Sequence, residues 1–209
     1  MLLLDDFQNA FNFYNSQLFN NSLPNCVFTL TRKARTKGYF SPKRYIDNSK
    51  DYKHEIAINP TYLVSTTDIQ VLSTFVHELC HMYMEEVGKA GKRGYHNKAW
   101  ASLMESIGLI PSSTGGPGGK KTGYSMTHYI DENGRFFQIT NDFINNGFKF
   151  HLIDSSSNEI KKEDEKVVNS SSSKNGKRIK YKCLCSQVWG KSNLQLICGQ
   201  CNHKLTPIV

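Results

Sequence analysis

Features that would place this chain in a membrane or outside the cell are missing from its sequence. No apolar run approaches the roughly 20 residues that a membrane-spanning helix requires. The opening segment, Met1-Leu2-Leu3-Leu4-Asp5-Asp6, has neither the basic flank nor the length of a secretion signal. The sequence has no internal repeat. We therefore expect a cytoplasmic protein that has no membrane partner.

Acidic residues are too few to balance the basic ones. The chain has 26 Lys and Arg against 18 Asp and Glu, which gives a net charge of +8. The basic residues cluster at Arg32–Lys37, Lys43-Arg44, Lys89–Arg93, Lys120-Lys121 and Lys174–Lys182, with Tyr39, Tyr45, Tyr181 and Trp189 interleaved. Such clusters bind phosphates without sequence preference, and exposed aromatic rings stack on unpaired bases. The alternative is a solvated basic surface with no specific role.

Composition divides the chain of 209 residues into three parts. Residues 1–153 carry most of the aromatic side chains, enough for one ordinary domain with its own core. Residues 154–176 are rich in serine and mixed charges and cannot bury enough apolar area to offset the entropy of ordering, so we expect a flexible linker. The segment 177–209 is too short to fold stably without an additional cross-link, which a bound zinc ion would supply.

The segment His77-Glu78-Leu79-Cys80-His81 is the most informative motif in the sequence. On a helix, His77 and His81 lie one turn apart on one face. Two neutral ring nitrogens at that separation can bind one metal ion, and Glu78 is placed to deprotonate water at the metal. The motif therefore predicts a metal-dependent hydrolase, above all a peptidase. The alternative is a helix with two ordinary histidines.

A catalytic zinc site needs three protein ligands and one open position. We expect His96 as the third ligand, because it follows a glycine- and lysine-rich loop that reverses the chain and it opens a second amphipathic helix. The alternative for His96 is a solvent-exposed residue at a helix start. His128 is the second choice as a ligand, and Glu105 would serve only if the turn were tighter than we suppose. Tyr124, His128 and Tyr129 are candidates for a further donor to the substrate, or else they pack beneath the helices.

Four cysteines near the C-terminus have the spacing of a zinc ribbon. Cys183-x-Cys185 and Cys198-x-x-Cys201 are separated by twelve residues that resemble a hairpin. Four thiolates that converge on one ion make a structural zinc site. Because the first pair is tight, His203 is a substitute ligand. Two disulfides are the alternative, but nothing indicates export. The two other cysteines fall within apolar patterns, where we expect buried thiols.

Hydrophobic periodicity predicts an α+β fold. Helices are expected at residues 5–20, 68–87, 97–107 and 140–146, strands at 26–32, 37–45, 54–59 and 135–139, and an exposed glycine-rich loop at 112–121. Thr67 and Gln70 have the pattern of a capping box at the start of the helix that carries the motif. We expect this helix to pack against a small β-sheet, with its two histidines at the border of the core.

These segments together resemble the SprT-like zinc metallopeptidase family, in particular its bacterial or mobile-element members that carry a C-terminal zinc ribbon. The likeness rests on His77-Glu78-x-x-His81 followed by His96-x-x-x-Trp100, on the opening Phe11–Pro24, on His54–Pro60 before the motif helix, and on the C-terminal cysteines. The family usually has glycine directly before the third histidine, whereas here Tyr95 follows Gly94. The first cysteine pair is also one residue shorter than usual.

The resemblance implies a zincin-like domain that hydrolyses peptide bonds. In it, His77, His81 and His96 would bind the catalytic zinc, and Glu78 would be the general base and later the proton donor. A second, structural zinc would lie on the four C-terminal cysteines. The eukaryotic branch of the family includes the Spartan proteases, which degrade proteins crosslinked to DNA. The resemblance therefore implies DNA-associated protein substrates and a DNA partner that is single-stranded or bound without sequence preference.

Two other classes of function fit the same residues. One is a non-catalytic zinc protein that binds nucleic acid or transcription machinery and uses its histidine site only for structure. Glu78 separates this class from a peptidase, since a structural site has no need of an adjacent carboxylate. The other is an interaction protein of a mobile element that blocks a host factor. No feature of the sequence indicates an oligomeric state.

Overall fold

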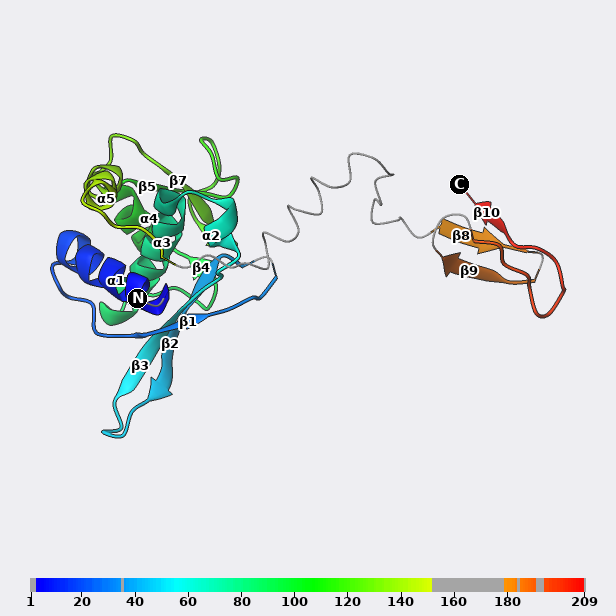
Figure 1. Ribbon diagram of the computed structural model, residues 1–209, viewed down its shortest axis with the longest axis horizontal. Coiled ribbons are helices and arrows are strands. Elements are labelled where there is room, and N and C mark those ends of the chain that lie inside the picture. The colour runs from blue at the N-terminus through cyan, green and yellow to red at the C-terminus, as the bar shows by residue number, and fades with distance from the viewer. Residues whose placement is uncertain (1–2, 35, 152–178, 184, 191–193, 209) are drawn as a thin grey trace. The chain divides into compact units, whose positions relative to one another are not determined.

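The computed structural model describes residues 3–34, 36–151, 179–183, 185–190 and 194–208 (Figure 1). The chain divides into two compact units, Met1–Ile160 and Lys161–Val209. The predicted linker, residues 154–176, lies outside the described residues. None of the described helices is long and apolar enough to cross a membrane.

The first unit is a mixed α+β arrangement. In chain order its elements are α1 (Leu3–Phe19), β1 (Val27–Leu30), β2 (Gly38–Ile46), β3 (Tyr52–Ile58), α2 (Tyr62–Ser65), α3 (Asp68–Glu86), β4 (Tyr95–His96), α4 (Lys98–Ser106), β5 (Leu109–Ser112), β6 (Gly123–Tyr124), β7 (Thr127–Ile130) and α5 (Arg135–Asn145). In a sheet of order β1-β3-β2, the central strand β3 is parallel to β1 and antiparallel to β2. The strand β2 therefore forms an edge of this sheet. The expected strands at 26–32, 37–45 and 54–59 and the expected helices at 5–20, 68–87 and 97–107 are confirmed to within two residues.

The long helix α3 lies at the centre of the helical layer (Figure 1). Its fully buried apolar side chains include Leu72, Phe75, Val76 and Leu79, which follow the i, i+3, i+4, i+7 pattern of one helix face. Phe75 packs against Phe7 of α1, with ring centroids 5.3 Å apart, and α3 also packs on β2 and α4. At the start of the helix, the Thr67 N–H donates to Gln70 Oε1 at 3.4 Å. Local capping and core packing thus both favour a helix over the same residues.

The structure corrects the prediction for the segment that follows β7. The expected strand at residues 135–139 is wrong, because these residues form the first part of α5. Phe136 and Thr140, four residues apart, are both fully buried, and the Thr140 hydroxyl is hydrogen-bonded to the Tyr14 hydroxyl at 2.8 Å. A short apolar run does not distinguish a strand from a helix by its periodicity. Here packing against α1 decides in favour of the helix.

The second unit contains a small antiparallel sheet. Its strands are β8 (Ile179–Lys182), β9 (Gln187–Gly190) and β10 (Thr206–Ile208), in the order β10-β8-β9. Its described core consists of buried Tyr181, Cys198 and Leu205, with Cys183, Leu196 and Cys201 packed against them. So few apolar side chains supply little folding free energy, which makes a further source of stability necessary.

Candidate metal centre

The helix α3 carries both histidines and the carboxyl group of the predicted motif. His77 and Glu78 are buried, with 8% and 7% of their surface exposed. His81 follows one turn later, and its Nε2 atom lies 3.2 Å from His77 Nε2. The two rings therefore present the same nitrogen to one point, as the spacing predicts.

His96 approaches this point from β4, which pairs with β6. It lies one residue before Asn97, whose side chain caps α4 by accepting a hydrogen bond from the Trp100 N–H. The Nδ1–H group of His96 donates to the Gly123 carbonyl at 3.1 Å, which leaves Nε2 unprotonated. That Nε2 atom lies 3.0 Å from His81 Nε2. The structure therefore brings the expected third ligand to the other two.

The three ring nitrogens have the spacing that a zinc ion requires. Among the described residues, ligand atoms of His77, His81 and His96 lie within 4.8 Å of one another. A tetrahedral zinc at about 2.0–2.1 Å from each nitrogen would separate the nitrogens by about 3.3 Å. The observed separations of 3.0 and 3.2 Å are close to this value. Three histidines with a free fourth direction are a ligand set of catalytic zinc.

Burial keeps these imidazoles neutral, which metal binding requires. It is the main cause that lowers the pKa of His77 well below 6.5, and His81 nearby lowers it further. Burial also lowers the pKa of His81 to about 3, and it lowers the pKa of His96 against the opposing effect of the Gly123 carbonyl. Trp100 stacks on His81, with ring centroids 5.2 Å apart. The ligands are therefore both deprotonated and held in place.

The carboxyl group of Glu78 is buried and has a perturbed pKa. Burial raises the pKa of its carboxyl group to about 8, and the Phe40 backbone N–H, which donates to it from β2, opposes the rise. A carboxyl group that titrates near neutral pH can take up and release a proton during a reaction. A divalent cation beside it would favour the ionised form, because opposite charges stabilise each other.

His128, the second choice as a ligand, contacts the Nδ1 side of His77, opposite the Nε2 atom that faces His81. Its Nδ1 atom lies 3.2 Å from His77 Nδ1, and its Nε2 atom lies 3.0 Å from Ser73 Oγ. The Ser73 hydroxyl donates to the Gln70 carbonyl at 2.8 Å. The serine oxygen therefore accepts from His128 Nε2–H, and His128 Nδ1 accepts from His77 Nδ1–H. This chain fixes the proton of His77 on Nδ1 and leaves Nε2 for a metal. The sequence offers no signal for this role, because the partners are far apart in it.

The remaining candidates lie away from the histidine group. Glu105 forms an ion pair with Lys121, with Oε1 and Nζ 2.5 Å apart, and it is absent from the group of possible ligands found among the described residues. Tyr124 is 65% exposed. Within the described part of the chain, neither Tyr124 nor Tyr129 lines the cleft over the histidines, whereas His128 does.

A cleft of about 1330 Å³ lies over the histidines and Glu78. The edge strand β2 with the segment before it lines one side, and the loop between α3 and β4 also contributes. The basic residues in the lining are Lys33, Lys37, Lys43, Arg44, Lys92 and Arg93, and the acidic ones are Glu55, Glu78 and Glu85. The cleft is thus large enough for an extended chain segment and is positively charged on balance.

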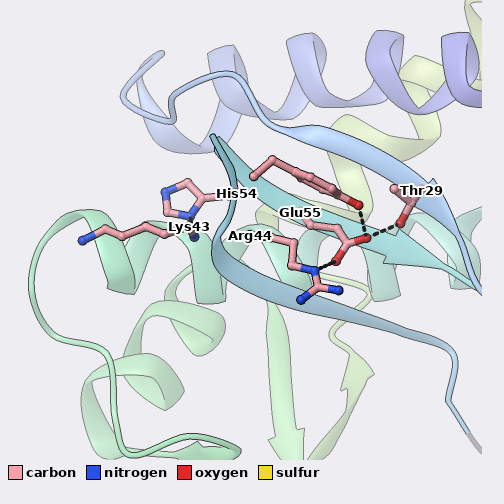
Figure 2. Close-up of polar contacts among 6 residues, drawn as sticks. Thr29, Lys43, Arg44, His54 and Glu55 are labelled. Carbon is pink, nitrogen blue, oxygen red and sulfur yellow. Dashed lines mark hydrogen bonds and ion pairs between the residues drawn. The ribbon is translucent and has the colours of Figure 1, made fainter. Parts of the chain in front are cut away.

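A bulge in β2 holds part of this basic wall in a fixed shape (Figure 2). Lys43 has a positive φ of 49°, and its N–H donates to His54 Nδ1 at 3.1 Å. On β3 opposite the bulge, buried Glu55 accepts hydrogen bonds from the hydroxyl groups of Thr29 at 2.8 Å and Tyr45 at 3.1 Å. Arg44 Nε lies 3.8 Å from the other carboxylate oxygen. The bulge therefore has defined partners on β3, the strand next to it.

The four predicted cysteines converge in the second unit. The Sγ atoms of Cys183 and Cys185 lie 3.7 Å apart, those of Cys185 and Cys198 3.5 Å, and those of Cys183 and Cys201 3.6 Å. Sulfurs at about 2.3 Å from a tetrahedral zinc lie about 3.8 Å apart, whereas a disulfide needs about 2.05 Å. All four cysteines are free. The geometry fits zinc and does not fit the alternative of two disulfides.

Hydrogen bonds at this cluster favour a thiolate. The backbone N–H groups of Cys201 and Gln200 lower the pKa of Cys198 to about 6. The side chains of Cys201 and Cys198 raise the pKa of Cys185 to about 12, because its S–H is hydrogen-bonded to neighbouring sulfur atoms. His203 is outside the cluster, and its Nδ1–H donates to the Cys201 carbonyl at 2.7 Å. The tight first pair therefore contributes both of its sulfurs.

Comparison with known proteins places the histidine site within a known family. A sequence profile described as the SprT-like family matches residues 7–120, more than half of the chain, and this range contains the three histidines and Glu78. A relative described as an uncharacterized protein in the mucB 3' region of Salmonella typhimurium is 46% identical over 48 residues, which are 23% of this chain and 65% of the relative. The match thus spans just under two thirds of that relative's length. No solved structure matches the chain. The chain belongs to the SprT-like family.

Proposed function

We propose that the first unit is a zincin-like zinc metallopeptidase of the HExxH type that acts on proteins associated with DNA. The observation that carries this proposal is the convergence of three histidine Nε2 atoms beside the buried carboxyl group of Glu78, at the wall of a large cleft. Membership of the SprT-like family supports the same chemistry. A purely structural histidine site would have no need of Glu78.

The chain's own residues account for the steps of peptide hydrolysis. A zinc ion on the three histidines would supply Lewis-acid polarisation and lower the pKa of water to about 7. Glu78 accepts the proton of the attacking water and passes it to the leaving amine. His128 keeps His77 in the tautomer that presents Nε2. Trp100 packs against the histidine rings and excludes water from that side of the site.

Glu78→Gln tests this proposal directly. Glutamine keeps the shape of the side chain and still accepts from the Phe40 N–H, but it cannot take up a proton. We expect zinc content to be retained and hydrolysis of casein to fall by roughly 100-fold or more. Glu86→Gln is the matched control, because it makes the same substitution on the same helix outside the cleft lining. Its oxygen can still accept the hydrogen bond from His54 Nε2–H that Glu86 receives at 2.9 Å.

The outcomes separate the proposed function from its alternative. Full hydrolysis by the Glu78→Gln protein would remove this residue from the mechanism. A wild-type protein that holds zinc on its histidines and cuts nothing, with or without single-stranded DNA, would favour the non-catalytic zinc protein instead.

We propose further that the second unit is a zinc ribbon that binds DNA, single-stranded or without sequence preference. Trp189 is 66% exposed, and Lys180 Nζ lies 5.9 Å from its ring centroid. Lys180 pairs with Trp189 across β8 and β9, while Tyr181 between the two lysines is buried on the opposite face. Lys180, Lys182 and Trp189 therefore share one face of the sheet. Such a face can stack an unpaired base and neutralise phosphates.

Trp189→Ala tests this second proposal. Loss of one base stack should weaken binding of a single-stranded oligonucleotide by about fivefold or more, measured by fluorescence anisotropy at two salt concentrations. Val188→Ala is the control, because Val188 lies on the same strand and points to the other face. Unchanged DNA affinity after deletion of residues 174–209 would refute the assignment to this unit.

A further inference from the structure

A second, smaller cavity adjoins the cleft beside the histidine site. Its volume is about 340 Å³. It shares five lining residues with the cleft: Lys37, Tyr62, Thr74, Thr127 and His128. His128, which lines the cavity, is in hydrogen-bond contact with His77, so the cavity lies close to the proposed metal position. A residue next to the bond being cut could therefore place its side chain there.

The walls of this cavity combine apolar and polar side chains, and the hydroxyl groups of several of them are already engaged. Ile58, Val71 and Ile130 contribute hydrocarbon surface. The hydroxyls of Thr66 and Thr74 donate to backbone carbonyls of α2 and α3, at 2.5 and 3.2 Å respectively. Within the described part of the chain, no Asp or Glu lines this cavity. The cavity thus offers an incoming side chain apolar contacts but no carboxylate.

Among the described residues that line the cavity, Lys37 supplies the one full charge. Its Nζ atom lies 5.3 Å from the centroid of the Tyr62 ring, which also lines the cavity. In the described part of the chain, no carboxylate is paired with Lys37. The positive charge of Lys37 also lowers the pKa of His128 and of His77. In both cases burial is the larger cause, and for His77 the charge of Lys37 is the smallest of the causes. An uncompensated ammonium group therefore lies where the cavity meets the cleft.

We propose that this cavity is a substrate subsite that accepts an acidic side chain, glutamate, with Lys37 as its partner. The methylene groups of glutamate would contact Ile58 and Val71, and the carboxylate would pair with the ammonium group of Lys37. A glutamine in the same place would lose the charge attraction, and a lysine would be repelled. The assignment rests on the proposed peptidase function, since it names the substrate of that site.

Peptide affinity tests the subsite without any need for turnover. The full-length Glu78→Gln protein, loaded with zinc, is titrated against three fluorescent peptides. The peptides are identical and uncharged apart from one central position, which holds Glu, Gln or Lys. We expect the Glu peptide to bind about two- to fivefold more tightly than the Gln peptide, the range of ion pairs that stay partly solvated. The Lys peptide should bind most weakly. Lys37→Met should abolish the order, and Lys37→Glu should invert it.

Lys33→Glu is the matched control. Lys33 lines the wide cleft but not the cavity, so this variant has the same change in net charge and should keep the order of the three peptides. An order that survives Lys37→Glu, or that Lys33→Glu inverts as well, would overturn the proposal. The same peptides are incubated with the wild-type protein in parallel. If none is cut, the peptidase function fails, and the affinities still decide what the cavity binds.

Discussion

Acidification of the zinc-free protein tests the electrostatics of the histidine site. Burial lowers the pKa of His81 to about 3 and that of His128 to about 4, whereas both have an ordinary value of 6.5. Below pH 6.5 the unfolded chain therefore binds protons that the folded protein excludes, and the free energy of unfolding falls as the pH falls. The buried His77 acts in the same direction.

The size of this loss follows from the shifts. Between about pH 7.5 and about pH 5.5, His81 and His128 each lower the free energy of unfolding by about 1.4 kcal/mol, or about 3 kcal/mol together. Glu78 acts in the opposite direction, because burial raises its pKa from 4.5 to about 8 and the folded protein takes up this proton first. Over the same interval that uptake stabilises the folded protein by about 2.5 kcal/mol. It offsets most of the loss from the two histidines.

Glu78→Gln separates the two effects, because glutamine does not titrate. We expect the zinc-free variant to lose about 3 kcal/mol or more over this interval, and the zinc-free wild type to lose about 2.5 kcal/mol less. Urea unfolding of chelator-treated protein, followed by tryptophan fluorescence, measures both. Glu86→Gln should follow the wild type. Parallel pH profiles for wild type and Glu78→Gln would refute the reasoning, since they would mean that Glu78 stays ionised in the folded, zinc-free site.

Two further substitutions test the two metal sites, and a third tests a close backbone contact in the fold. His128→Leu removes the acceptor for the N–H of the first ligand, and zinc affinity measured with a competing chelator should fall by about 10- to 100-fold. Cys198→Ser should lose one zinc ion per chain by metal analysis and leave peptide hydrolysis by the first unit intact. Gly108→Ala should lower the free energy of unfolding by about 2–4 kcal/mol, because its φ is +88° and a Cβ would lie 2.7 Å from a facing backbone atom. Gly116→Ala, where a Cβ meets nothing within 4 Å, should be nearly neutral in the same urea assay.

The parts of the fold that the sequence predicts are those where local and tertiary preferences agree. The motif helix is the best example: Thr67 and Gln70 favour its start, and its apolar residues recur with the helical period. Both signals are local, so the predicted range and the range of α3 differ by one residue at most. The histidines of the motif needed only this helix to come together.

The first turn of α5 shows where such reasoning fails. Its sequence, Arg-Phe-Phe-Gln-Ile, contains strand-forming residues in a run too short to reveal a period. The deciding contact is between Thr140 and Tyr14, which are 126 positions apart. The paired strands β4 and β6 were also missed, since two residues each carry no periodic signal. Yet this pairing orients His96, because the Gly123 carbonyl that fixes its tautomer lies on β6.

His128 shows a deeper limit of sequence reasoning about metal sites. A ligand and the residue that supports it are both histidines, so residue type and spacing cannot tell them apart. The distinction lies in which nitrogen faces which partner: three Nε2 atoms meet at one point, whereas His128 turns Nδ1 towards His77 and Nε2 towards Ser73. If His128 were a fourth ligand, His77 would lose the acceptor that fixes its proton, and the zinc would lose its open position. The same four rings would then form a closed structural site. The side-chain orientation of His128 therefore bears on whether this centre can carry out catalysis.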